Sequence, residues 1–214
     1  MDLNITLAII IITCLVSVPA FSSQKMIDDL IFYPPAIYHR NQWYRFFTCG
    51  FIHADWMHLA FNMLAFYSFG NLIEDAFTQL FGGTGKLLYI ILYVSSLFFC
   101  LLPTYIKHRD NAYYRSLGAS GAVSAIVFVF ILLYPTEKIG IIFLPSMPGF
   151  IFGFLYLIIS SVLANRGGSH INHSAHLWGA VYGVVFTVIA AFVFQGYNLP
   201  TLFLQQVQGY FSSL

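Results

Sequence analysis

Long apolar runs separated by short polar or proline- and glycine-containing segments make up almost the whole chain. A run of about 20 apolar residues is long enough to cross a membrane as a helix. Runs of roughly this kind predict helices at residues 3–21, 56–76, 87–102, 119–134, 149–164 and 171–194. The pattern therefore predicts an all-α membrane protein with six transmembrane helices, folded as a single domain over residues 1–214.

Two segments between the runs need their own interpretation. Residues 22–55 are polar and aromatic, and the pair Pro34-Pro35 excludes a continuous helix there. Their Trp, Tyr and Phe content favours a loop that lies in the membrane interface. Residues 139–149, IGIIFLPSMPG, are apolar but short and broken by two prolines, which predicts a connection at the membrane surface.

Composition agrees with the pattern and narrows the location. The chain is 59% hydrophobic and 8% charged with a net charge of +1, which is typical of an integral membrane protein and leaves no basic face for nucleic acid. Cys14, Cys49 and Cys100 lie too far apart for a zinc spacing or a disulfide framework. No basic, serine-rich presequence is seen, so a bacterial cytoplasmic membrane is the simplest location.

Polar side chains gather at the starts of alternate helices. Because the second, fourth and sixth helices cross in the same direction, their N-terminal ends lie at one face. Ser120 begins the fourth helix and His176 lies within about two turns of the start of the sixth. His58 and Asn62, spaced i,i+4, share one face of the second helix. The topology therefore predicts that these four groups come to a similar depth.

A serine needs a base within hydrogen-bonding reach to act as a nucleophile, and a neutral imidazole can supply it. Each residue alone also has a structural interpretation: Ser120 as a helix cap, serine and asparagine as interhelical packing, histidine as a satisfied interior residue. The combination favours chemistry, with Ser120 and His176 as catalytic residues. The backbone N–H of Ser120, at a helix start, can stabilise a developing oxyanion.

Several motifs together resemble the rhomboid intramembrane serine proteases across nearly the whole chain. GASG at residues 118–121 is similar to the family's GxSG, and AHLWGAVYG at 175–183 to its AHxxGxxxG. HADWMHLAFN at 53–62 resembles its second-helix signature, and WYR at 43–45 its first-loop Trp-Arg element. FGNLIE, ending at Glu74, and FGFLYL in the fifth helix also resemble family stretches.

The resemblance implies a six-helix rhomboid bundle with a Ser-His dyad and no cofactor or metal. Ser120 is then the nucleophile, His176 the general base, and His58 and Asn62 part of the oxyanion hole. The glycines of the two motifs, Gly118, Gly121, Gly179 and Gly183, are expected to let the fourth and sixth helices approach closely. The implied substrate is a transmembrane segment of another membrane protein, locally unwound and with a small residue before the cut; the sequence indicates no oligomeric state.

Two features depart from the family. Ser124 stands where some members have an aromatic residue that packs on the histidine ring, so another group must orient His176. The family topology opens the site to the extracytoplasmic side, whereas the basic residues of the loops favour the opposite orientation. We follow the family topology, since the embedded first loop is expected to hold some of these basic residues in place. The basic residues in the loops expected on the outer side are Lys25, Arg40, Arg45, Lys107, Arg109, Arg115 and Arg166.

Two other functional classes remain open. A metal site is one, built from His170, His173 and His176 with His53 or His58, because histidine is a common ligand. A non-catalytic rhomboid relative that binds membrane substrates is the other. Such relatives usually lack the serine or the histidine, and both are present here.

Overall fold

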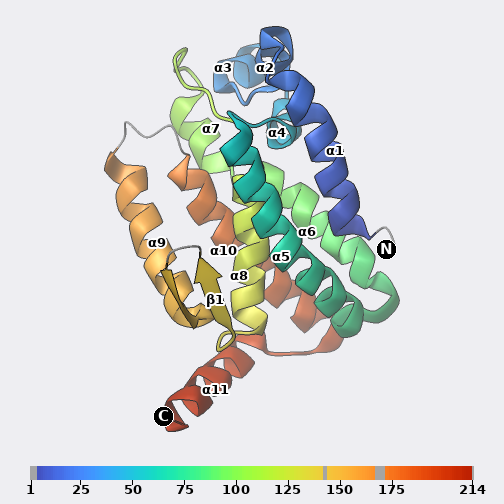
Figure 1. Ribbon diagram of the computed structural model, residues 1–214, viewed down its shortest axis with the longest axis vertical. Helices are drawn as coiled ribbons and strands as arrows, with labels where there is room; N and C mark the ends of the chain where they lie inside the picture. Colours follow the sequence, from blue (N-terminus) through green and yellow to red (C-terminus); the bar gives the residue numbers. More distant parts are fainter. Residues whose placement is uncertain (1–3, 142–143, 167–171, 214) are drawn as a thin grey trace.

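The computed structural model describes residues 4–141, 144–166 and 172–213, and it is a bundle of helices with one short β-hairpin (Figure 1). The helices of the bundle are α1 (Ile5–Ala20), α5 (Trp56–Phe81), α6 (Gly85–Phe99), α8 (Ser120–Leu133), α9 (Gly149–Arg166) and α10 (His173–Gln195). The shorter helices are α2 (Gln24–Leu30), α3 (Pro34–Arg40), α4 (Arg45–Thr48), η1 (Cys49–Phe51), η2 (Gly82–Thr84), α7 (Leu102–His108) and α11 (Leu199–Ser212). The prediction of a mainly helical protein is confirmed.

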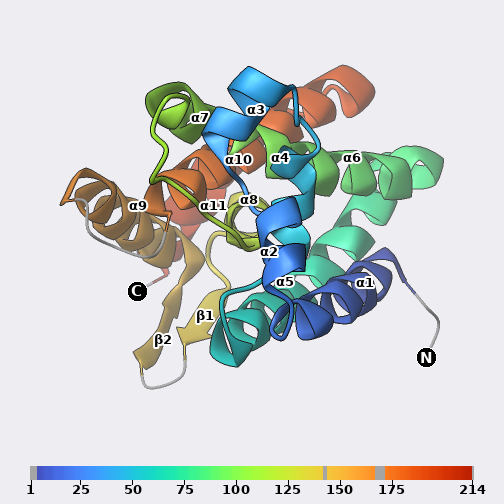
Figure 2. The same cartoon turned by 90° about the horizontal axis from the view of Figure 1, so that it is seen from above.

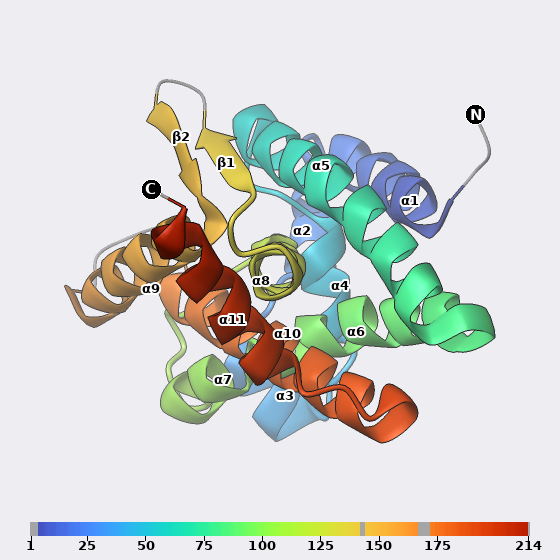
Figure 3. The ribbon, with the colours of Figure 1, turned by 90° about the horizontal axis from the view of Figure 1, so that it is seen from below.

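Helix α8 lies at the centre of the bundle. Nearly all of its side chains are buried, which fits a helix that is apolar on every face. It packs most extensively against α10 and also contacts α5 and α6. Figure 3 shows α8 end-on with these helices around it. Side chains along most of α8, from Gly121 to Leu132, therefore lie inside the protein.

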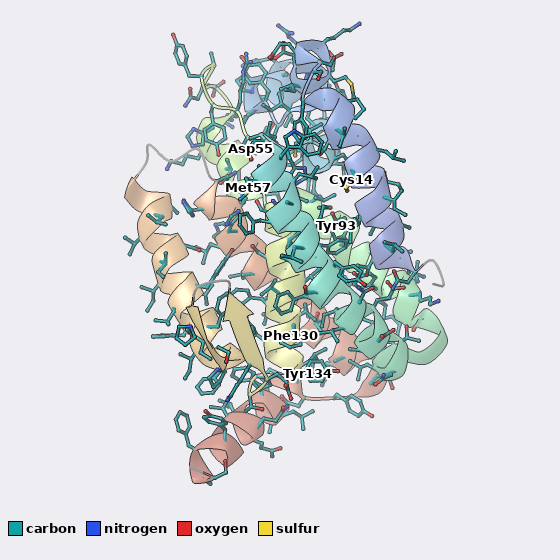
Figure 4. The ribbon with its side chains drawn as sticks, viewed as in Figure 1. Cys14, Asp55, Met57, Tyr93, Phe130 and Tyr134 are labelled. Atoms are coloured by element: carbon teal, nitrogen blue, oxygen red, sulfur yellow. The ribbon has the colours of Figure 1, made fainter. Side chains whose placement is uncertain are left out.

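The N-terminal ends of α5, α8 and α10 lie at the same end of the bundle, as their common direction predicts (Figure 1). Figure 4 places Asp55 and Met57, at the start of α5, near this end, and Phe130 and Tyr134, at the end of α8, near the other. The short helices α2, α3, α4 and α7 cover the same end. The three helix starts are thus brought together at one end of the bundle, next to these short helices.

Residues 22–55 form packed short helices and no continuous helix, as the pair Pro34-Pro35 predicts, and their place in the membrane interface stays a prediction. Pro34 and Pro35 begin α3, where a missing N–H costs nothing. Arg45 is buried, and its Nη1 donates to the carbonyl oxygens of Asp28 and Ile31, both at 2.8 Å. Its guanidinium holds α2 and α4 together. Arg45 is therefore a basic residue held in place within the first loop, as expected above.

The segment 139–149 is also more ordered than expected. Strand β1 (Lys138–Ile141) pairs in antiparallel fashion with β2 (Leu144–Pro148), with Ile139 opposite Met147. Ile139 is buried in the main core. Seen from above, the hairpin lies beside α9 (Figure 2). The protein is therefore not all-α, because backbone hydrogen bonds pair this apolar stretch as two short strands, the second of which contains Pro145 and Pro148.

Several helix bounds differ from the predictions. Helix α5 continues to Phe81, five residues past the predicted end, and α1, α8 and α9 keep their predicted positions to within two residues. Pro103, just past the predicted end of the helix at residues 87–102, lies in the first turn of α7. The predicted start of the last helix, Ile171, lies outside the described residues. The C-terminal tail forms α11, in which Leu199 is buried.

Two stretches in the described parts of the chain are long and apolar enough to cross a membrane, Trp56–His108 and His173–Gln195. The first contains α5, α6 and α7. Three helices are apolar but shorter: Ile5–Ala20, Ser120–Leu133 and Gly149–Ala164. By length and composition, the structure supports membrane-spanning helices without fixing their number at six.

A buried carboxylate joins α1 to α5. Glu74 is 3% exposed and accepts hydrogen bonds from the backbone N–H of Ile5 at 3.0 Å and of Thr6 at 2.9 Å. It also accepts from the Thr6 hydroxyl at 2.9 Å. The first N–H groups of a helix have no partner within the helix, and a negative charge there is favoured by the helix dipole. Glu74 therefore fixes the start of α1 on the bundle.

We expect Glu74→Ala to destabilise the protein by about 3 kcal/mol, since it removes three hydrogen bonds of about 1 kcal/mol each. Detergent unfolding of the purified protein, followed by circular dichroism during titration with dodecyl sulfate, measures this. Asp75→Ala, at the exposed neighbouring position, is the control and is expected to change stability little. Equal effects of the two variants would contradict the assigned role.

Candidate active site

Ser120 and His176 are in hydrogen-bonding contact. The Oγ of Ser120 lies 2.6 Å from Nε2 of His176, although the residues are 56 positions apart in the chain. Ser120 is the first residue of α8, and the cap position, Ala119, makes no side-chain capping bond. The hydroxyl therefore contacts the imidazole and the helix start has no side-chain cap, so the capping interpretation of Ser120 is wrong.

Glycines allow α8 and α10 to come this close. A Cβ added at Gly179 would overlap the carbonyl oxygen of Gly121 and lie 2.8 Å from its carbonyl carbon. A Cβ at Gly183 would lie 2.5 Å from the carbonyl oxygen of Ala125. Gly121 in turn faces Cys100 and the carbonyl oxygen of Ala175. Backbone meets backbone along this seam, and the contact between Ser120 and His176 lies at one end of it.

The residues just before Ser120 are tied to the segment 22–55. Ser116 forms an isolated antiparallel bridge with Phe32, and the Gly118 N–H donates to the carbonyl oxygen of Cys49 at 2.9 Å. Gly118 has a φ of +111°, which L side chains rarely adopt, and a Cβ there would lie 2.7 Å from Cε1 of His58. The chain therefore enters α8 by a turn that only glycine fits.

His53 makes a third contact between the segment 22–55 and the residues just before Ser120. The sequence indicated it only as a possible metal ligand. Its ring is fully buried, with Nδ1 2.9 Å from the Ser17 hydroxyl, which donates to the carbonyl oxygen of Phe51 at 2.8 Å. Nε2 accepts from the Ala119 N–H at 3.5 Å. This pattern requires a neutral ring with its proton on Nδ1. Burial is the main cause that lowers the pKa of His53 to about 3, and His58 adds to it.

The lowered pKa of His53 has a consequence for acid stability. As pH falls below about 6.5, His53 becomes protonated in the unfolded chain but stays neutral in the folded protein. The free energy of unfolding therefore falls by about 1.4 kcal/mol per pH unit toward pH 3. We expect His53→Phe to show a shallower loss of stability between pH 6 and pH 4 than the wild type. Dodecyl sulfate unfolding at several pH values measures it, with His39→Phe, at an exposed position on α3, as the control. Parallel pH profiles for the wild type and His53→Phe would contradict a neutral buried ring.

His58 lies beside the turn before Ser120, and Asn62 follows one turn later on the same helix. The His58 ring faces Gly118 and is 5.0 Å from the His53 ring, centre to centre. Asn62 is buried and one hydrogen of its amide goes to the His58 carbonyl oxygen at 2.9 Å. His58 is thus next to the turn that carries Ser120, while the second amide hydrogen of Asn62 remains for another acceptor. Their part in an oxyanion hole stays a prediction.

Ser124 makes a contact that its sequence position did not reveal. Its hydroxyl lies 2.8 Å from the Tyr156 hydroxyl, on α9. An aromatic side chain thus reaches this region from α9 and not from α8. The His173 ring lies 5.9 Å from the His176 ring, centre to centre.

A cavity of about 340 Å³ opens beside His176. Its walls come from α9, the hairpin and the start of α10, and they include Pro145, Met147, Phe152, Tyr156, Ser160 and His176. Apart from a few hydroxyl and imidazole groups the lining is apolar. The cavity can therefore hold an apolar chain segment next to the serine and the histidine.

Of the histidines considered for a metal site, His53, His58, His173 and His176 belong to the described residues. His170 lies outside the described residues. Within residues 4–141, 144–166 and 172–213, no three His, Cys, Asp or Glu side chains group so as to hold a metal ion. The arrangement of the described histidines therefore offers no support for metal chemistry.

The fold and the site together define a helical membrane protein with a serine–histidine pair where two helix starts meet. A family model described as the rhomboid domain matches residues 40–192. The chain therefore belongs to the rhomboid family.

The similarity to individual relatives extends over different shares of the two chains compared. The chain is 30% identical over 154 residues to RHOMBOID-like protein 12, mitochondrial, of Arabidopsis thaliana, which covers 64% of this chain and 44% of that protein. It is 26% identical over 175 residues to YdcA of Bacillus subtilis (strain 168), named as a candidate rhomboid protease, covering 81% and 79%. The human presenilin-associated rhomboid-like protein, mitochondrial, is 29% identical over 137 residues, covering 63% and 34%. The chain thus spans less than half of two of these relatives.

Proposed function

We propose that this chain is an intramembrane serine endopeptidase that cleaves a peptide bond in or near the transmembrane segment of another membrane protein. The observation that carries the proposal is the 2.6 Å contact between Ser120 Oγ and His176 Nε2. Membership of a family that includes serine proteases supports it, as does the apolar cavity beside the pair.

The reaction we propose needs only groups of this chain and water. His176 Nε2 accepts the Ser120 proton as Oγ attacks the substrate carbonyl, and the oxyanion forms near the Ser120 N–H, which has no acceptor within its helix. His176 then protonates the leaving amine, so the peptide bond breaks and the acyl group stays on Ser120. A water molecule, deprotonated by His176, hydrolyses the ester and restores both residues. His58 and the free amide hydrogen of Asn62 are the further donors we propose for the oxyanion.

The proposed setting is a bilayer crossed by α1, α5, α6, α8, α9 and α10. The substrate segment must be unwound locally, because a helix shields its own peptide bonds. A bacterial cytoplasmic membrane with the site open to the extracytoplasmic side stays a prediction. The relatives include mitochondrial and bacterial proteins and so leave the location open.

A reconstituted cleavage assay tests the function. The purified chain is placed in liposomes with a single-pass substrate that carries a small residue and helix-weakening glycines near one end. We expect two fragments from the wild type, none from Ser120→Ala, and no effect of a chelator. Binding of the substrate without cleavage would indicate a non-catalytic relative, and chelator-sensitive cleavage by Ser120→Ala would indicate a metal site. Either result would overturn the proposal.

A further inference from the structure

We propose that Asn172 is a positioning residue that ties the segment before Ser120 to the first turn of the helix that carries His176. This inference rests on the proposed function for its catalytic meaning, but the tie itself is a separate structural claim. Asn172 comes four residues before His176 in the chain, and its partner Ser116 comes four residues before Ser120.

The hydrogen bonds of Asn172 settle how its side-chain amide is turned. Oδ1 accepts from the backbone N–H of Ala175 at 3.0 Å, which makes Asn172 the N-cap of α10. A backbone N–H can only donate, so the oxygen must face it and the NH₂ group must face the other way. On that side Nδ2 donates to Oγ of Ser116 at 3.5 Å. The main-chain oxygen of Asn172 accepts from the N–H of His176 at 3.3 Å.

A further hydroxyl group joins this contact to α7. Thr104 is buried, and its hydroxyl donates to Oδ1 of Asn172 at 3.4 Å. Three polar side chains, Thr104 from α7, Ser116 from the turn before α8 and Asn172 at the start of α10, thus form a connected group. Each of these hydrogen bonds is long, so the group joins the segments through the combined effect of its bonds.

The position of this group complements the glycine seam. Gly179 and Gly183 set the distance between α8 and α10 along their length, on the far side of the reactive pair from Asn172. Asn172 and Ser116 join the chain on the near side, where both segments enter their helices. Because a misplacement of about 1 Å can cost 100-fold in rate, holding the pair from both sides favours the 2.6 Å contact.

Two single variants separate this tie from helix capping. Asn172→Ser keeps a good N-cap but is too short to reach Ser116, and Ser116→Ala removes the tie from its other end. The matched control is Asn198→Ser, which makes the same exchange at the N-cap of α11, where Asn198 accepts from the Thr201 N–H. We expect each of Asn172→Ser and Ser116→Ala to lower kcat about 10-fold with KM unchanged. Unfolding midpoints should match that of Asn198→Ser.

The double variant gives the sharper result. If one contact carries both effects, Asn172→Ser with Ser116→Ala should also lose about 10-fold and not about 100-fold. Amide hydrogen exchange should rise in peptides covering residues 113–120 in all three variants and stay unchanged in Asn198→Ser. Additive losses, or unchanged kcat and unchanged exchange, would overturn the tie. If the wild type itself does not cleave, the proposed function fails, while the exchange measurement still decides on the tie.

Discussion

Replacing His176 by phenylalanine is expected to lower cleavage of a transmembrane substrate by about 10⁴- to 10⁶-fold. Phenylalanine keeps an aromatic ring of similar size against the same neighbours but has no nitrogen at the position 2.6 Å from Ser120 Oγ. The hydroxyl then has no base, and a serine with an ordinary pKa is a poor nucleophile. Initial rates in liposomes, with fragments quantified by mass spectrometry, measure the loss.

The matched control for this variant is one turn of helix away. His173→Phe changes a ring 5.9 Å from that of His176 and leaves the serine contact in place, so we expect at most a several-fold change in rate. Comparable losses in the two variants would mean that the region is sensitive to any change of ring. Substantial activity in a folded His176→Phe variant would contradict the role of His176 as the base.

Gly179→Val is expected to lower activity by about 100-fold or more without altering any reacting group. The added side chain would occupy the space of the Gly121 carbonyl group, so α8 and α10 must move apart and carry Ser120 and His176 with them. Forcing extra carbon atoms into a tightly packed seam also costs about 1–3 kcal/mol of stability. Cleavage rates and dodecyl sulfate unfolding of the same preparation measure the two effects.

The same exchange at an open position controls for the effect of valine in a helix. Gly209 lies in α11 with no heavy atom within 4 Å of where a Cβ would be, so Gly209→Val should leave both rate and stability nearly unchanged. A well-folded Gly179→Val variant with wild-type turnover would contradict the view that this seam sets the geometry of the site.

The sequence predicts the long helices because their apolar runs exceed any other signal in the chain. It fails where elements are short. Pro34 and Pro35 correctly exclude a continuous helix, but the pattern does not show that they begin a short helix of their own, where proline is favoured. Strands β1 and β2 escaped prediction because their four and five residues carry no clear alternation, and β2 contains Pro145 and Pro148.

The topology predicts that Ser120 and His176 come to a similar depth, since alternate helices present their starts at one face, and the family resemblance adds their pairing. The side chains that support the pair were not predicted. His53 bonds Ser17 across 36 positions, and Asn172 bonds Ser116 across 56. Such contacts leave no local pattern, because they join separate elements that meet only in the folded chain. The same holds for Ser124, whose partner Tyr156 lies on another helix.

The central claim is that the hydroxyl of Ser120 is made nucleophilic by His176. Reaction of the reconstituted wild-type protein with a fluorophosphonate, followed by peptide mass spectrometry, tests it most directly. We predict a single phosphonyl adduct on Ser120 in the wild type, none in Ser120→Ala, and labelling of His176→Phe reduced at least 100-fold. An unmodified Ser120 in a wild-type protein that cleaves its substrate, or equal labelling of Ser120 in His176→Phe, would contradict the account.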